Sequence, residues 1–157
     1  MSDGPLLLAD TMTVSWYVLA PDRLSAAATS ILEEHALAGR PISVSAYSVL
    51  ELVYMKEKVA NGISMEEFDA IMEVLEDVEG PFVVVPMDRE VAAGVIEVPR
   101  RFDDVDGKSV VNADPGDRMI AATALKHDLT IVTCDNKLHS LARVIDNLTV
   151  LWQTGVQ

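Results

Sequence analysis

The 157-residue sequence contains a single cysteine, Cys134, and no long hydrophobic run. One cysteine cannot form an intrachain disulfide, which fits a reducing compartment such as the cytoplasm. A membrane-spanning helix needs about 20 consecutive apolar residues, and no uninterrupted apolar segment of the sequence reaches that length. We therefore expect a cytoplasmic protein with no membrane span.

Basic residues are also few. The chain has 12 Lys and Arg against 25 Asp and Glu, so its net charge is −13. A chain this acidic has no broad basic face with which to hold nucleic acid. A phosphate-containing substrate would need metal ions and a few local Lys or Arg side chains, or a partner chain that supplies the positive charge.

Several signatures of common enzymes are missing as well. The sequence has no Walker loop, no dinucleotide-binding glycine fingerprint and no zinc signature. It shows no internal repeat, low-complexity segment or linker. Its length suits one domain with one sizeable core, so we expect a single domain over residues 1–157.

The sequence does contain short apolar segments that alternate with helical ones. Buried strands are expected at residues 6–8, 42–44, 82–85 and 130–133, with a possible fifth at 148–152. Residues 100–113 are charged and irregular, and we expect a loop there. The alternation predicts an α/β fold of three layers, in which helices cover both faces of a mostly parallel sheet of about five strands.

Acidic residues stand where these strands end or where helices begin. Asp10 follows the first strand, Asp135 follows the fourth, and Asp114 and Asp117 open a helix. Ligands of α/β proteins bind outside the carboxyl ends of the parallel strands, so these side chains are expected to point into one crevice. Carboxylates brought together repel one another unless a cation lies between them, and a hard divalent metal is the usual one.

Each of these acids also has a purely structural interpretation as a helix cap or as a charge near a helix start. Of the pair at the helix start, we expect Asp117 to be the ligand and Asp114 to be the cap or a supporting acid. Thr11, next to Asp10, is a candidate to orient a carboxylate or to bind a phosphate oxygen.

Glu51 lies within an apolar stretch, Val49–Met55. The glutamate is either exposed on a polar strip of its helix or partly buried with a partner. A partly buried acid needs a cation or hydrogen-bond donors. The apolar flanks on both sides favour the second alternative and a functional role.

Four segments, in their order and spacing, resemble PIN-domain proteins, and among them the VapC-type ribonuclease toxins of prokaryotic toxin–antitoxin pairs. The most specific segment reads Asp-Pro-Gly-Asp-Arg-Met-Ile-Ala-Ala-Thr-Ala from Asp114 to Ala124. The other three are residues 6–11, 45–52 and 129–135.

The resemblance implies a metal-dependent endoribonuclease with an α/β/α fold. Asp10, Glu51, Asp117 and Asp135 would hold Mg²⁺ or Mn²⁺, and Thr133 would assist them. The substrate would be RNA, the partner a cognate antitoxin, and the assembly a homodimer.

Two other hypotheses stay open. The chain is alternatively a PIN-like protein-interaction module with weak or no nuclease activity, which the charge of −13 favours mildly. It is otherwise an aspartate-dependent phosphatase or phosphoacceptor domain, because Asp10 at a strand end resembles a nucleophile. That chemistry commonly uses a second aspartate two residues later, where this chain has Met12.

Overall fold

The computed structural model describes residues 4–104 and 106–152. Five strands form one sheet in the order β3-β2-β1-β6-β7, and every neighbouring pair is parallel. The strands are β1 (Leu7–Ala9), β2 (Ile42–Ser45), β3 (Phe82–Val85), β6 (Thr130–Val132) and β7 (Val150–Leu151). The predicted α/β class and the predicted parallel sheet of five strands are therefore confirmed.

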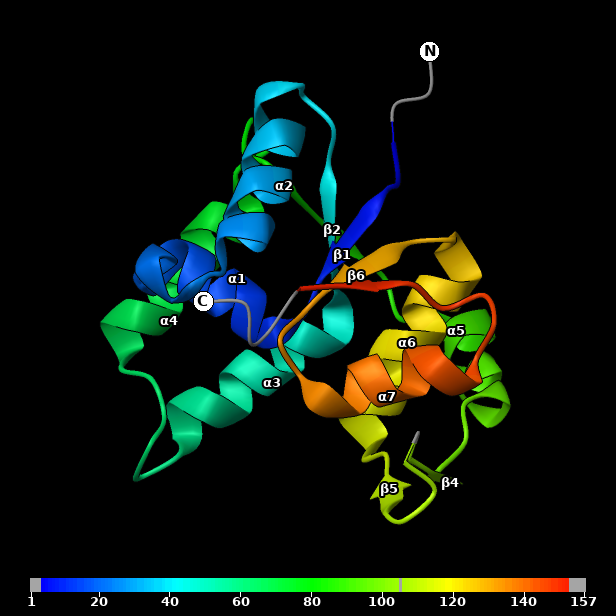
Figure 1. The fold of residues 1–157 in the computed structure, drawn as a ribbon. Helices are drawn as coiled ribbons and strands as arrows, with labels where there is room; N and C mark the ends of the chain where they lie inside the picture. The colour runs from blue at the N-terminus through cyan, green and yellow to red at the C-terminus, as the bar shows by residue number, and fades with distance from the viewer. Residues whose placement is uncertain (1–3, 105, 153–157) are drawn as a thin grey trace.

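Helices cover both faces of this sheet, as Figure 1 shows with α1, α2 and α4 on one side and α5, α6 and α7 on the other. The helices are α1 (Thr11–Leu19), α2 (Ala26–Leu37), α3 (Ala46–Glu57), α4 (Met65–Glu76), α5 (Arg89–Gly94), α6 (Pro115–His127) and α7 (Asn136–Val144), and Pro21–Arg23 and Val95–Glu97 form short 3₁₀ turns. The result is the predicted three-layer α/β/α architecture. Within the part of the chain that the structure describes, every helix is too short or too polar to cross a bilayer.

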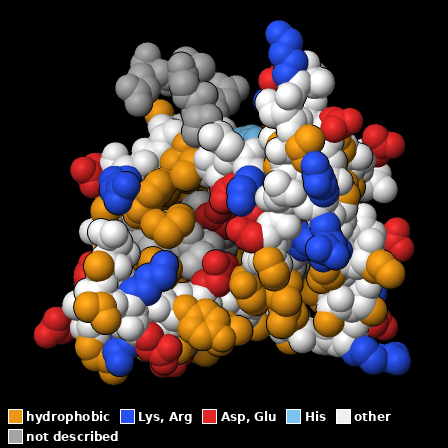
Figure 2. All heavy atoms as spheres, turned by 90° about the horizontal axis from the view of Figure 1, so that it is seen from below, with side chains coloured by type: hydrophobic (Ala, Val, Ile, Leu, Met, Phe, Trp, Pro, Cys, Tyr) orange, Lys and Arg blue, Asp and Glu red, His pale blue; other side chains and the backbone are white. Residues whose placement is uncertain are grey.

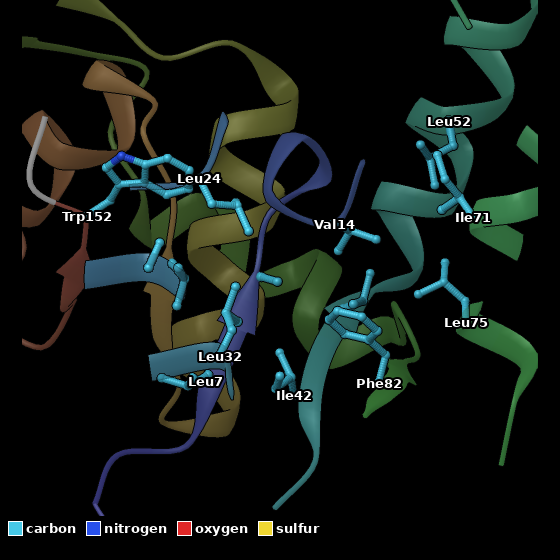
Figure 3. Close-up of a cluster of buried hydrophobic side chains, with 14 residues drawn as sticks. Leu7, Val14, Leu24, Leu32, Ile42, Leu52, Ile71, Leu75, Phe82 and Trp152 are labelled. Atoms are coloured by element: carbon cyan, nitrogen blue, oxygen red, sulfur yellow. The ribbon is translucent and has the colours of Figure 1, made fainter. Parts of the chain in front are cut away.

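The central strand β1 sends alternate side chains into two cores. Leu7 packs in a cluster with α1, α2 and α4, and Leu8 packs in a second cluster with α5, α6 and α7. Figure 3 shows the first cluster, where Leu32 of α2 and Ile42 of β2 lie near Leu7. Both strand residues are fully buried, as expected for a parallel sheet that is covered on both faces.

All seven α-helices in the described residues begin after a Ser or Asp whose side chain accepts a hydrogen bond from a backbone N–H of the first turn. These N-caps are Asp10, Ser25, Ser45, Ser64, Asp88, Asp114 and Asp135. Such caps satisfy N–H groups that have no partner within the helix. Because Asp10 and Ser45 are at the ends of β1 and β2, the chain turns there from strand directly into helix.

Two predictions about local structure are wrong. Residues expected to form a loop contain an antiparallel hairpin of β4 (Arg101–Asp103) and β5 (Val110–Asn112). The third strand was expected to be buried, but Val83 and Val84 are 50% and 37% exposed. The reason is that β3 is an edge strand, which pairs on one side only.

Candidate functional site

The carboxyl ends of β1, β2 and β6 meet at one edge of the sheet. Ala9 is in register with Val44 on one side and with Val132 on the other, so the residues that follow each strand emerge together. A cleft of about 130 Å³ lies there. Its lining residues are Asp10, Thr11, Met12, Glu51, Asp114, Gly116, Asp117, Ile120, Asp135 and Leu138.

The structure thus brings together the four predicted metal ligands, as well as the supporting residues Thr11 and Asp114. Figure 2 views this end of the molecule and shows acidic side chains gathered near the middle of the face. Thr133, the remaining supporting residue, does not line the cleft but lies directly behind it, in contact with Asp10.

Asp10 is buried and both of its carboxylate oxygens accept hydrogen bonds. The Thr13 N–H donates to Oδ1 over 2.9 Å, and the Thr133 hydroxyl donates to Oδ2. Burial raises the pKa of Asp10, although these hydrogen bonds oppose the shift. The Asp10 carboxylate is therefore both the N-cap of α1 and a desolvated charge beside the cleft.

Glu51 is half-buried on α3 and accepts a 2.7 Å hydrogen bond from the Thr11 hydroxyl. The same hydroxyl lies 2.9 Å from the Ser48 hydroxyl. Burial raises the pKa of Glu51, and the charges of Asp10, Asp114 and Asp135 add to the rise. The prediction of a partly buried glutamate with a polar partner is confirmed, and that partner is Thr11.

Asp114 and Asp117 share the capping of α6. The Asp117 N–H donates to Asp114 Oδ1 over 3.0 Å, and the Asp114 N–H donates back to Asp117 Oδ2 over 3.2 Å. Asp117 is buried, whereas Asp114 is exposed with Lys137 Nζ 3.7 Å from its Oδ2. Burial, together with the charges of Asp135 and Asp114, raises the pKa of Asp117 to about 7.

Asp135 caps α7 through the backbone N–H groups of Lys137 and Leu138. Its own N–H donates to the Thr133 hydroxyl oxygen over 3.0 Å. Since that hydroxyl donates in turn to Asp10, Thr133 links two of the acidic residues. The structural and the functional interpretations of Asp135 are thus compatible, because capping engages one carboxylate oxygen.

The donor atoms of the cleft suit a divalent cation. Carboxylate oxygens are the donors that Mg²⁺ prefers, and three of the carboxylates have pKa values raised by burial and mutual repulsion, which a cation would relieve. Among residues 4–104 and 106–152, no three His, Cys, Asp or Glu side chains are arranged to hold one ion directly. Mg²⁺ usually takes one or two protein carboxylates and keeps several waters, so the donor set fits an ion bound partly through water.

The sequence did not indicate the roles of Gly116, which lines the cleft, and of Tyr47, which lies against Gly116. A Cβ at position 116 would lie 3.2 Å from the Tyr47 ring and 3.3 Å from Asp114 Oδ1, so this close approach favours glycine. Burial raises the pKa of the Tyr47 hydroxyl, with a further contribution from Glu51. The spacing of Tyr47 and Glu51, one helical turn apart, was the available signal.

Comparison with known proteins identifies the family. The family model of the PIN domain matches residues 7–144. The chain belongs to the PIN-domain family. It is 30% identical over 134 residues to "Ribonuclease VapC22" of Mycobacterium tuberculosis, a similarity that covers 85% of this chain and 90% of the relative.

Solved structures agree with this PIN-domain fold. VapBC2 from Rickettsia felis, bound to a DNA fragment from its promoter, matches with a TM-score of 0.61 and 16% identity over 93% of this chain and 98% of the other. FitAcB from Neisseria gonorrhoeae matches with a TM-score of 0.59 and 24% identity over 92% and 96% of the two chains. Because both sequence identities are below 25%, this similarity establishes the fold alone.

Proposed function

We propose that this PIN-domain protein is a metal-dependent endoribonuclease and the toxin of a toxin–antitoxin pair. The observation that carries the proposal is the cleft at the carboxyl edge of the sheet, where Asp10, Glu51, Asp117 and Asp135 meet. The similarity to a relative named a ribonuclease supports RNA as the substrate. Gathering four buried or partly buried acids costs desolvation and repulsion that capping alone does not offset, whereas a bound cation would offset both.

In this proposal Asp10, Glu51, Asp117 and Asp135 hold Mg²⁺ or Mn²⁺, some of them through water. When bound, such an ion lowers the pKa of water and offsets the charge that develops on a phosphodiester. The hydrogen bonds from Thr13 and Thr133 keep the Asp10 carboxylate oriented. The hydroxyl of Thr11 does the same for Glu51.

We infer hydrolysis without a covalent enzyme intermediate. A water molecule attacks the phosphorus in line, and the bond from phosphorus to the leaving sugar oxygen breaks as the new bond forms. An ionised carboxylate of the cleft accepts the proton of the attacking water, and the leaving sugar oxygen takes up a proton from solvent. This step needs no nucleophilic side chain, which agrees with the engagement of both Asp10 oxygens in hydrogen bonds.

The partners in this proposal are RNA, a cognate antitoxin and a second copy of the chain in a homodimer, in the cytoplasm. The structural neighbours include VapBC proteins of Rickettsia felis and Salmonella typhimurium and a toxin–antitoxin complex of Klebsiella pneumoniae. The net charge of −13 suits an antitoxin with a basic segment. A PIN-like interaction module without nuclease activity is the second candidate, and the same acidic surface favours it.

Replacement of Asp10 tests the proposal. Asp10→Asn keeps the shape and the capping oxygen but removes a charge from the cleft, so we expect metal-dependent cleavage of a labelled RNA to fall below detection while circular dichroism stays unchanged. Asp69→Asn, on the exposed surface of α4, is the matched control and should cleave like the wild type. Metal-dependent cleavage retained by Asp10→Asn would contradict the proposed role of the cluster.

A further inference from the structure

A second cavity, of about 750 Å³, lies where the β4–β5 hairpin meets α6. Its lining residues are Ile96, Val98, Pro99, Arg100, Arg101, Asn112, Ala113 and Arg118. Three of the 12 basic residues of the chain face this one space, and none of the residues that line it is acidic. In a chain with a net charge of −13, such a concentration of positive charge marks the cavity as a site for an anion.

The backbone fixes where two of these arginines emerge. Arg101 is in register with Asn112 across the hairpin, and the Ala113 N–H donates to the Arg100 carbonyl over 2.9 Å. Ala113 directly precedes Asp114, which lines the acidic cleft. The cavity and the cleft are thus neighbours that share the segment from Asn112 to Arg118.

Arg118 is held at the cavity wall by neutral partners. Its Nε donates to the Val98 carbonyl over 2.9 Å, and its Nη2 donates to the Val95 carbonyl over 3.0 Å. These bonds fix the guanidinium without neutralising its charge. The position next to Asp117 places this charge on the first turns of α6, beside the cleft.

The three guanidinium groups have no acidic counterpart in the described part of the chain. No carboxylate there lies within 4.0 Å of Arg100, Arg101 or Arg118, although ion pairs of that length do form at four other basic residues, Arg40, Lys126, Lys137 and Arg143. Guanidinium groups bind phosphate oxygens through paired N–H donors. An external phosphate is therefore the ligand whose chemistry fits the cavity.

We propose that Arg100, Arg101 and Arg118 bind backbone phosphates of single-stranded RNA and hold the strand beside the acidic cleft. This inference rests on the proposed nuclease function and adds a subsite to it. The three arginines attract the RNA locally, while the acidic remainder of the protein surface repels it. The cavity thus provides the local positive charge that a chain this acidic needs for a phosphate-containing substrate.

The test is the salt dependence of RNA binding by Arg100→Gln/Arg101→Gln, measured by fluorescence anisotropy in the Glu51→Gln background so that the RNA stays intact. Each phosphate contact to a single strand contributes about 0.7 to the slope of log K against log salt. We expect the slope to become shallower by about 1.4. Arg118 is left in place because it also ties α6 to the segment before β4.

Arg89→Gln/Lys126→Gln is the matched control, since it removes the same charge. Lys126 lies eight residues after Arg118 on α6, about 12 Å along the helix axis. Its ion pair with Glu90 brings α5, where Arg89 precedes Glu90, to that end of α6. In the nuclease-competent chain, the Arg100/Arg101 variant should raise KM and leave kcat near the wild-type value.

A slope equal to that of the control, with wild-type KM, would overturn the phosphate site and leave the nuclease proposal intact. A wild-type chain that neither binds nor cuts RNA would overturn both. A shallower slope together with a raised KM would support both.

Discussion

At the scale of single residues, the acidic side chains of the cleft serve two purposes at once. Asp10, Asp114 and Asp135 cap helices, and the same side chains line the cleft. From the sequence alone, capping and metal binding are competing explanations for each acid. The structure shows that they are compatible, because a cap engages one or two lone pairs of a carboxylate that has about four.

Asp117 gives a residue-scale prediction for stability against pH. Its pKa is about 7 in the folded chain, above its ordinary value of 3.8. Between about pH 4 and pH 7 the folded chain therefore keeps a proton that the unfolded chain has released. The free energy of unfolding should fall as the pH rises through this window and should level off above it.

Asp117→Asn removes this dependence and keeps an oxygen that accepts the Asp114 N–H. In EDTA, urea unfolding should show that the variant is more stable than the wild type at pH 8 and that the difference vanishes near pH 4. Mg²⁺ at pH 8 should stabilise the wild type and have a smaller effect on the variant. Parallel pH profiles of the two chains would show that Asp117 does not carry a raised pKa.

At the scale of helices and strands, His35 joins α2 to the segment that leads into β1. The side chain is buried, and its two ring nitrogens lie 3.0 Å from the Ile31 carbonyl and 2.9 Å from the Pro5 carbonyl. A histidine with no metal-ligand spacing in the sequence thus has a structural role. It positions the central strand β1, which ends directly before Asp10.

Replacement of His35 should therefore destabilise the fold. His35→Ala leaves a cavity and removes the ring N–H that donates to a backbone carbonyl, so we expect urea unfolding to show a loss of about 2–4 kcal/mol. Glu33→Ala, exposed on the same helix, is the control and should change stability by less than about 0.5 kcal/mol. Equal effects of the two substitutions would show that the histidine contacts do not stabilise the fold.

The elements that the sequence failed to predict are those whose residues are weakly buried. The strands of the β4–β5 hairpin, Arg-Phe-Asp and Val-Val-Asn, have three residues each, which is too short for an alternation of apolar and polar residues to indicate a strand. The exposed Val83 and Val84 show the opposite error, because a run of valines predicts a buried strand wherever it lies in the sheet. Position in the sheet depends on tertiary pairing, which a local pattern does not contain.

At the scale of the whole molecule, the alternation of strands and helices along the chain was predictable from the sequence, whereas the distribution of charge over the surface was not. Short apolar segments separated by capped helices indicated a parallel three-layer fold, and the acids at strand ends indicated the cleft. The net charge excluded a broad basic face, but it gave no sign that Arg100, Arg101 and Arg118 share one cavity. Their proximity arises from the β4–β5 hairpin, which forms in a segment whose sequence predicts a loop.

The most direct test of the nuclease proposal is cleavage of a labelled RNA pool by the purified wild-type chain, with and without Mg²⁺ or Mn²⁺. We predict cutting that needs the metal, that is lost in Glu51→Gln, and that is kept in Glu57→Gln, the exposed control on the same helix. Cutting that is equal in Glu51→Gln, or that persists in EDTA, would contradict a metal-dependent acidic site. Absence of both cutting and metal binding by the wild-type chain would favour the interaction module instead.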